Sequence, residues 1–143
     1  CAETASRMGV MMLYENHSKP AAWDYMDFSH PTEVFLTIAE ALRDTDVRIN
    51  FDTANTFVFG DDPLSVLARV IDRVETVHVA DVSEKGRLNP VTIGTGAVPI
   101  REIFAMLKQH GFDGWLCIEE ASGRGFDGIR EAVHNTRTLW SQA

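Results

Sequence analysis

The stretch TVHVADVSEKGRLNPVTIGTGAVPIREIFAMLKQHGFDGWLCIEE (76–120) predicts one complete strand–helix–strand unit. It begins and ends with short apolar runs, at 76–80 and 115–120, which are typical of buried strands. Between these runs, apolar residues at helical spacing predict a helix over 100–109, with Gly111 as its C-cap. Because a crossover helix joins the two strands, we expect them to lie parallel in one sheet.

The same unit repeats along the rest of the chain. Two further strands are predicted at 9–15 and 47–52, and further helices at 32–43, 64–74 and 128–140. The loops that follow strands are long and polar, whereas those that follow helices are short, which is typical of an eight-stranded (β/α)8 TIM barrel. We therefore predict an α/β fold in which residues 1–143 form half of such a barrel, with four parallel strands and flanking helices.

A half-barrel must cover its remaining sheet edges. Residues 1–7 are expected to form the last turns of a helix, so the sequence is interpreted as part of something longer. Closure is expected either through dimerisation or through a missing N-terminal half. The unbroken apolar run at 9–15 also predicts a strand that is covered on both faces.

Composition narrows the class of function. The formal net charge is −8, and the 13 basic residues are scattered, which argues against nucleic-acid binding. No stretch reaches the roughly 20 apolar residues of a membrane helix. The two cysteines, Cys1 and Cys117, do not make a disulfide framework, and Cys117 is expected to be a buried free thiol. A cytoplasmic protein is expected.

Each predicted strand contains a short hydrophobic run that ends on a side chain able to bind a metal. In chain order these are Glu15, Asp52, His78 and Glu119. Parallel strands with crossover helices bring such ends to one rim, and three carboxylates with one imidazole suit Mn²⁺ or Mg²⁺, with Zn²⁺ or Co²⁺ as further candidates. A single strand-end carboxylate is equally often a helix cap or a salt-bridge partner, so the prediction rests on the four residues together.

Other polar residues near these strand ends are candidates for contacts with a substrate. His17 and Asn55 are predicted to bind substrate, although a loop contact or an Asx turn would also account for them. Arg87 is predicted to hold a substrate carbonyl, carboxylate or phosphate. Glu120 is expected to point away from Glu119 and to make either an outward contact or a capping contact.

Two loop features are weaker indications. The segment Gly94–Thr95–Gly96 could approach a phosphate, but a simple turn explains it equally well. Trp23 and Phe57 lie in the long loops and could form the floor of a binding site.

Several of these motifs are similar to those of a known family. LYENH (13–17), INFDTAN (49–55), VHVAD (77–81) and IEE (118–120), in this order, resemble the sugar isomerase and epimerase superfamily with a xylose-isomerase-like barrel. The resemblance covers the whole chain and aligns it with the C-terminal half of the family barrel. It implies that Glu15, Asp52, His78 and Glu119 are the metal ligands, and that Glu15 and Glu119 are also the proton-transfer pair.

This resemblance implies an enzyme that acts on a sugar, a sugar phosphate or another polyol. A divalent cation polarises the substrate carbonyl and stabilises an enediolate, while the two glutamates move the proton. Return of the proton to either face or to the neighbouring carbon gives epimerisation or isomerisation, and loss of a β-hydroxyl gives an inosose-type dehydration. The alternatives are a non-catalytic half-barrel, expected to be a homo-oligomer, and a phosphodiesterase of the endonuclease IV type, which the negative charge disfavours.

Overall fold

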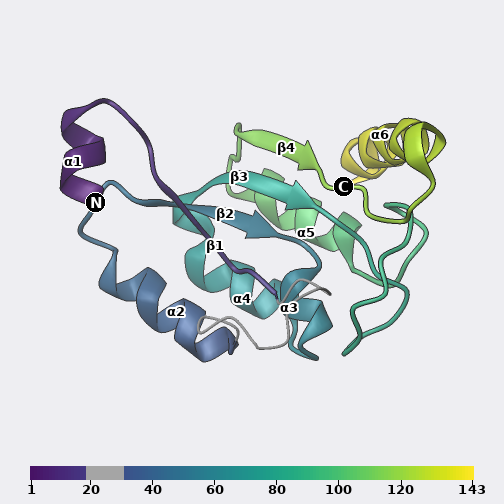
Figure 1. Ribbon diagram of the computed structural model, residues 1–143, viewed down its shortest axis with the longest axis horizontal. Helices are drawn as coiled ribbons and strands as arrows, with labels where there is room; N and C mark the ends of the chain where they lie inside the picture. Colours follow the sequence, from purple (N-terminus) through teal and green to yellow (C-terminus); the bar gives the residue numbers. More distant parts are fainter. Residues whose placement is uncertain (19–30) are drawn as a thin grey trace.

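The computed structural model describes residues 1–18 and 31–143, and a parallel sheet of four strands forms its centre (Figure 1). The strands are β1 (Leu13–Glu15), β2 (Arg48–Asp52), β3 (Val74–Val79) and β4 (Trp115–Ile118). Their order in the sheet is their order in the chain, and each pairs in parallel with the next. The predicted fold class of four parallel strands with flanking helices is confirmed.

Six helices and a 3₁₀ turn connect and flank these strands. They are α1 (Ala2–Arg7), α2 (Thr32–Ala41), α3 (Asn55–Val58), α4 (Pro63–Val70), η1 (Ile71–Arg73), α5 (Ile100–Gln109) and α6 (Gly125–Gln142). The helix predicted at 64–74 ends earlier, because the 3₁₀ turn η1 leads directly into β3. The short helix α3 lies where a loop was predicted. Among the described residues, no helix has both the length and the apolar character needed to cross a membrane.

One face of the sheet carries the hydrophobic core. Alternate strand residues point to this face, and α4 and α5 lie behind the sheet in Figure 1. The core side chains with 0% exposure include Ile49, Phe51, Val77 and Val79 from the strands, and Leu67, Ile103, Phe104 and Leu107 from the helices. This burial fixes which strand residues point to the opposite face, since a one-residue slip would reverse every side chain.

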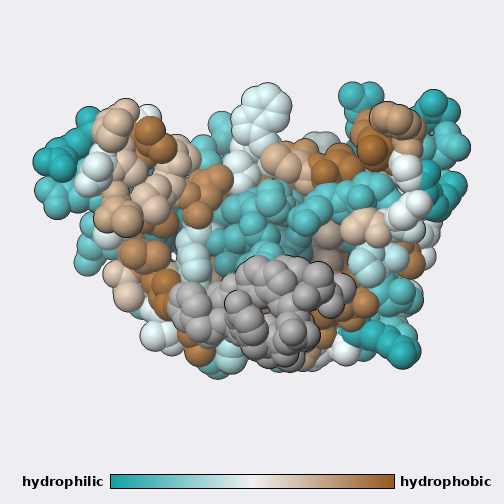
Figure 2. Space-filling view, in the orientation of Figure 1, coloured by the Kyte–Doolittle hydropathy of each residue, from teal (hydrophilic) through white to brown (hydrophobic). Residues whose placement is uncertain are grey.

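The opposite face of the sheet is polar and open. No described helix lies in front of it in Figure 1, and Figure 2 shows a hydrophilic band across its middle. Trp115 is 76% exposed on β4, and Cys117 is exposed rather than buried as predicted. The expectation that residues 9–15 are covered on both faces is also wrong, since Val10 and Met11 are more than half exposed and β1 begins only at Leu13. Cys117 is exposed because it points to the open face together with Trp115, whereas Val10 and Met11 lie before the first strand and outside the sheet.

Arg73 joins α2 to the sheet from a buried position. The residue is 6% exposed, and its guanidinium donates to the carbonyl oxygens of Ala39 (2.6 Å) and Leu42 (2.9 Å) at the C-terminal end of α2. It also donates to the carbonyl oxygen of Val47, just before β2. Arginine can satisfy three carbonyls together because its donors form a rigid fork.

We predict that Arg73→Met lowers the free energy of unfolding by about 2–5 kcal/mol, because it leaves buried carbonyls without donors. Urea denaturation followed by circular dichroism measures this change. Arg69→Met is the matched control, since Arg69 is exposed and lies 3.6 Å from the equally exposed Glu33, so it should change stability by less than about 0.5 kcal/mol. Equal effects of the two substitutions would contradict the prediction.

Candidate metal centre

Glu15, Asp52, His78 and Glu119 converge at the carboxyl ends of the four strands. Each offers one ligand atom, and these four atoms all lie within 4.8 Å of one another. Glu15 and Asp52 are the last residues of β1 and β2, His78 precedes the last residue of β3, and Glu119 follows β4 directly. We call these four residues the quartet.

The quartet follows a staggered register across the sheet. Asp52 pairs with His78, but Glu15 pairs with Asn50, and His78 pairs with Cys117 rather than with Glu119. Between β1 and β2, and again between β3 and β4, the ligand on the second strand therefore lies two residues beyond the register partner of the ligand on the first. Strands of a barrel are tilted against its axis, so residues at one height are staggered in register in this way.

A β-bulge sets the position of His78. Ile49 pairs with Val74, but the next residue of β2, Asn50, pairs with Thr76, so Glu75 is skipped. Without this shift, Asp52 would face Val77, whose side chain lies in the core. Bulges of this kind re-aim side chains next to functional sites.

The donor atoms of the quartet fit a divalent cation. His78 Nδ1 lies 3.5 Å from Glu15 Oε2 and 3.3 Å from Glu119 Oε2. This ring nitrogen is buried and has no hydrogen-bond partner among the described residues, which is unusual for a buried polar atom. Three carboxylate oxygens and one imidazole nitrogen form a ligand set suited to a hard or borderline cation such as Mn²⁺ or Mg²⁺.

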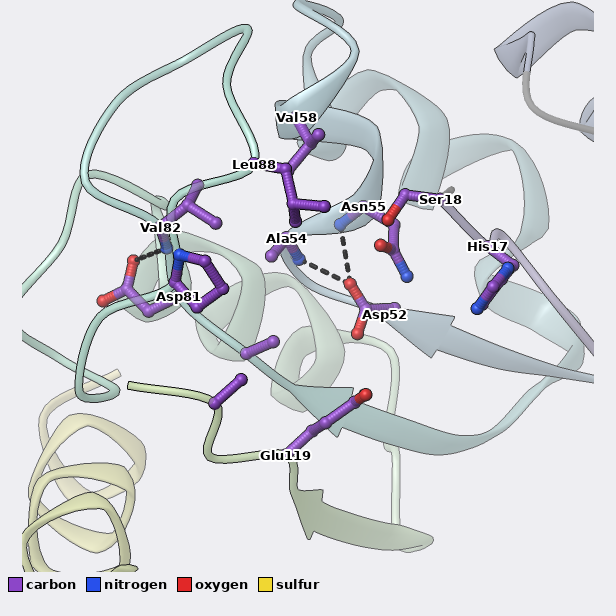
Figure 3. Close-up of a pocket in the computed structure, with 13 residues that line it drawn as sticks. His17, Ser18, Asp52, Ala54, Asn55, Val58, Asp81, Val82, Leu88 and Glu119 are labelled. Carbon is purple, nitrogen blue, oxygen red and sulfur yellow. Dashed lines mark hydrogen bonds between the residues drawn. The ribbon is translucent and has the colours of Figure 1, made fainter. Parts of the chain in front are cut away.

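Asp52 is the most buried member of the quartet, at 1% exposure. Its Oδ1 accepts from the backbone N–H groups of Ala54 (2.8 Å) and Asn55 (2.6 Å), as Figure 3 shows. Burial, with a smaller contribution from the charges of Glu119 and Glu15, raises the pKa of Asp52 to about 8 against the opposing effect of the two backbone donors. The free site therefore holds a proton that a bound cation would replace.

Asn16 extends the pairing of β1 with β2 beyond the end of β1. Its side-chain oxygen accepts from the backbone N–H of Asp52 (2.8 Å), and its amide donates to the Asp52 carbonyl (2.9 Å). The side-chain amide of Asn16 thus takes the place of a backbone peptide group in the pairing with β2, and it fixes the backbone at Asp52. Sequence reasoning quoted Asn16 within LYENH but gave it no role.

A cavity of about 320 Å³ opens beside the quartet (Figure 3). Asp52 and Glu119 form part of its wall, and Glu15 and His78 are not among its lining residues. The remaining lining is largely apolar and comprises Ala54, Val58, Ala80, Val82, Leu88, Pro90 and Ala121, with polar His17, Ser18, Asn55 and Asp81. A small molecule in this cavity would reach the quartet from one side.

Some of the predicted substrate-binding residues line the cavity, and others lie outside its lining. His17 and Asn55 line the cavity, and their roles stay predictions. Arg87 lies outside its lining, with its guanidinium 3.0 Å from the Glu84 carboxylate. Phe57 is also not among the lining residues, and Trp23 lies outside the residues that the structure describes.

Glu120 and Glu119 point to different surroundings, as alternation predicts. The Glu120 carboxylate accepts from the backbone N–H of Ser122 (2.9 Å), and more weakly from that of Ile93 (3.4 Å). The expected capping contact of Glu120 is therefore confirmed. The residue can serve as a control for its neighbour.

Asp81 is a cavity residue to which sequence reasoning gave no role. Its carboxylate accepts from four backbone N–H groups, of Val82 (2.9 Å), Gly94 (2.9 Å), Gly96 (2.8 Å) and Val98 (3.2 Å). Burial raises the pKa of Asp81, and these donors oppose the shift. The Gly94–Gly96 segment is thus a turn closed around the protein's own carboxylate, and the phosphate alternative is not supported. A signal existed in the sequence, because an aspartate directly after a strand precedes a glycine-rich turn.

The comparisons with known proteins agree with this architecture. A family model described as a xylose isomerase-like TIM barrel matches residues 1–139. A xylose isomerase domain protein from Planctomyces limnophilus superposes with a TM-score of 0.74 at 22% identity, covering 96% of this chain and 48% of that chain. At this level of identity the structural similarity shows the fold alone.

Curated relatives are similar at somewhat higher identity. A putative hydroxypyruvate isomerase from Streptomyces coelicolor is 29% identical over 126 residues, covering 85% of this chain and 43% of the relative. An inosose dehydratase from Lacticaseibacillus casei is 25% identical over 134 residues, covering 82% of this chain and 42% of the relative. The chain spans less than half the length of these curated relatives.

The raised pKa of Asp52 predicts how the metal-free chain responds to pH. Between about pH 4 and pH 8 the folded chain holds a proton on Asp52 that the unfolded chain has lost, so the free energy of unfolding falls as pH rises through this window. Urea titrations at several pH values measure the trend, and Asp52→Asn should flatten it. Saturating Mn²⁺ should offset the loss near pH 8. An identical slope in the native and Asp52→Asn chains would contradict the prediction.

Proposed function

Because the chain belongs to the family of the xylose isomerase-like TIM barrel, we propose that it carries the metal centre of a sugar isomerase or epimerase. The proposed enzyme depends on a divalent cation, Mn²⁺ or Mg²⁺ in the first instance, and acts on a sugar or a sugar phosphate. Its reaction passes through an enediolate of the substrate, with the proton moved by Glu15 and Glu119. The observation that carries the proposal is the quartet, with the buried Nδ1 of His78 between two carboxylates.

The two glutamates are suited to different parts of a proton transfer. Glu119 has a side chain that is 58% exposed and lines the cavity, where it could remove a proton from a carbon next to a carbonyl. Glu15 comes from the opposite edge strand and is only 24% exposed, so it could return a proton from the other side. A bound divalent cation would supply Lewis acidity at the substrate oxygens.

The destination of the proton decides which reaction results. Return to the same carbon on its other face inverts that centre, and return to the neighbouring carbon exchanges aldose for ketose. The inosose dehydratase among the relatives supports dehydration as a second candidate on the same residues. In that case the proton removed by a glutamate would be followed by loss of a β-hydroxyl.

We predict that the Mn²⁺-loaded protein exchanges deuterium from D₂O into the carbon next to the carbonyl of its substrate. Mass spectrometry on a panel of ketoses, hydroxypyruvate and inosose would detect this exchange, and a product lighter by one water would indicate the dehydratase. Glu15→Gln and Glu119→Gln should each lower the exchange rate by about 10²–10⁴-fold, because each removes a proton-transfer group. Glu120→Gln should retain activity, since Glu120 contacts Ser122 rather than the quartet. Unchanged exchange in both quartet variants would contradict the proposal.

We propose that a second four-stranded unit covers the open face of the sheet. A second copy of this chain is the unit that we consider, so the proposed assembly is a homodimer. The outer edges of β1 and β4 pair with no other described strand. Exposed hydrophobic side chains gather beside the open face around the N-terminal segment (Figure 2), and they include Met8, Val10, Met11 and Leu13. A two-fold axis along the barrel would pair β4 of each copy with β1 of the other and hide these side chains.

Light scattering coupled to size-exclusion chromatography is expected to give twice the mass of one chain. The double substitution Met11→Lys and Trp115→Lys should shift the protein towards monomer, since it places charges on the open face and beside an edge strand. Glu102→Lys is the control, because Glu102 is exposed on α5, which packs behind the sheet. A stable monomer of the native chain at micromolar concentration would count against self-assembly.

The proposed compartment is a reducing one, such as the cytoplasm. Cys1 and Cys117 are both free and exposed. Exposed thiols of this kind persist where the surroundings keep them reduced.

A further inference from the structure

We infer that Asn50 and Thr76 form a positioning relay that holds the Glu15 carboxylate in place for a divalent cation. This inference rests on the proposed function and assigns roles to two residues outside the quartet. Asn50 Nδ2 donates to Glu15 Oε2 at 2.9 Å, and Thr76 Oγ1 donates to Asn50 Oδ1 at 2.7 Å. The two bonds connect β3 to β1 through the middle strand β2.

The chemistry of Glu15 sets the direction of both bonds. An ionised carboxylate only accepts hydrogen bonds, so the Asn50 amide must present its NH₂ group to Glu15. The oxygen of the same amide then faces Thr76, and the threonine hydroxyl must donate to it. Thr76 thereby prevents the amide from rotating and presenting its oxygen to the carboxylate.

The backbone places the three residues side by side on the open face of the sheet. Glu15 is the register partner of Asn50, and Asn50 is the register partner of Thr76. The second pairing depends on the bulge, because a regular ladder after Ile49 and Val74 would bring Glu75 opposite Asn50. A carboxylate at that point could not donate to Asn50 Oδ1, whereas the threonine hydroxyl can.

The relay acts on the same oxygen that faces His78. Glu15 Oε2 lies 3.5 Å from His78 Nδ1, so the bond from Asn50 orients the carboxylate towards the centre of the quartet. A carboxylate oxygen has two lone pairs, and one bond from Asn50 leaves the other available to a ligand. Asn50 is 5% exposed, so water competes little for its amide. Partners of this kind reduce metal affinity by about 10–100-fold when they are replaced.

The test is Mn²⁺ binding to the chain, followed through the electron paramagnetic resonance signal of free Mn²⁺. Asn50→Leu should weaken Mn²⁺ binding by about 10–100-fold. Thr76→Val should weaken binding less, and Thr76→Ser should restore it because the hydroxyl returns. The double variant Asn50→Leu and Thr76→Val should bind like Asn50→Leu alone, since both residues act through one bond to Glu15.

Asn135→Leu is the control for loss of a half-buried side-chain amide that donates a hydrogen bond. Asn135 Nδ2 donates to the Ile93 carbonyl at 2.9 Å, away from the quartet, so this variant should lose stability while keeping its Mn²⁺ affinity. If Asn50→Leu behaves like Asn135→Leu, with lower stability and unchanged affinity, the positioning role is overturned. Additive losses in the double variant would overturn the relay in the same way.

A second measurement needs no metal and separates this inference from the proposed function. Hydrogen exchange of the Asn50 side-chain amide, followed by NMR, should be slow in the native chain and faster in Thr76→Val and Glu15→Leu. Equal exchange in all three would overturn the relay. Failure of the native chain to bind Mn²⁺, with the exchange pattern intact, would refute the metal centre and leave the hydrogen-bonded relay standing.

Discussion

The arrangement at the carboxyl ends of the four strands depends on one constraint, which is the repulsion among three carboxylates held around one imidazole. Two unit charges 4 Å apart interact by about 4 kcal/mol at an effective dielectric constant of 20, which is comparable to the whole stability of a marginal domain. The structure relieves this repulsion in three ways. Backbone N–H groups donate to Asp52, the amide of Asn50 donates to Glu15, and Asp52 keeps a proton to about pH 8. A bound cation would attract each carboxylate and so offset the repulsion among them. The arrangement of the quartet is therefore suited to a metal ion.

The irregular part of the sheet places the imidazole of the quartet. His78 faces Asp52 only because β3 carries an extra residue at Glu75, and that bulge needs space beside it. Gly114 provides the space, since a Cβ atom there would lie 2.0 Å from the Glu75 carbonyl oxygen. Glycine is thus required just before β4 for a steric reason. The bulge, the glycine and the position of the imidazole form one arrangement.

Much of the architecture could be predicted from the sequence, because apolar periodicity reports burial. The helix at 100–109 has the predicted bounds, and four parallel strands follow from alternating strand and helix patterns. The convergence of the quartet was also accessible, since the ends of parallel strands share one rim. The open face was not, because residues 9–15 have the same apolar pattern whether or not another half covers them. The role of Asn50 was hidden, because it depends on a register shift that no local pattern specifies. Asp81 had a weak signal in its place directly after a strand, but its partners Gly94 and Val98 lie 13 and 17 residues further along the chain.

The loop that follows β3 is fixed at both ends, and residues of both anchors also line the cavity. Asp81 anchors the far end of the loop through Gly94, Gly96 and Val98, and the near end is closed by a bridge between Val82 and Pro90. The tip between these anchors carries Leu88, which lines the cavity, and it takes no part in either anchor. The tip is also tied to α3, because the backbone N–H of Gly86 donates to the Phe57 carbonyl oxygen (3.0 Å). An exchange of Leu88 would therefore change the apolar wall of the cavity while the bonds of Asp81, the bridge and the contact of Gly86 with α3 stay in place.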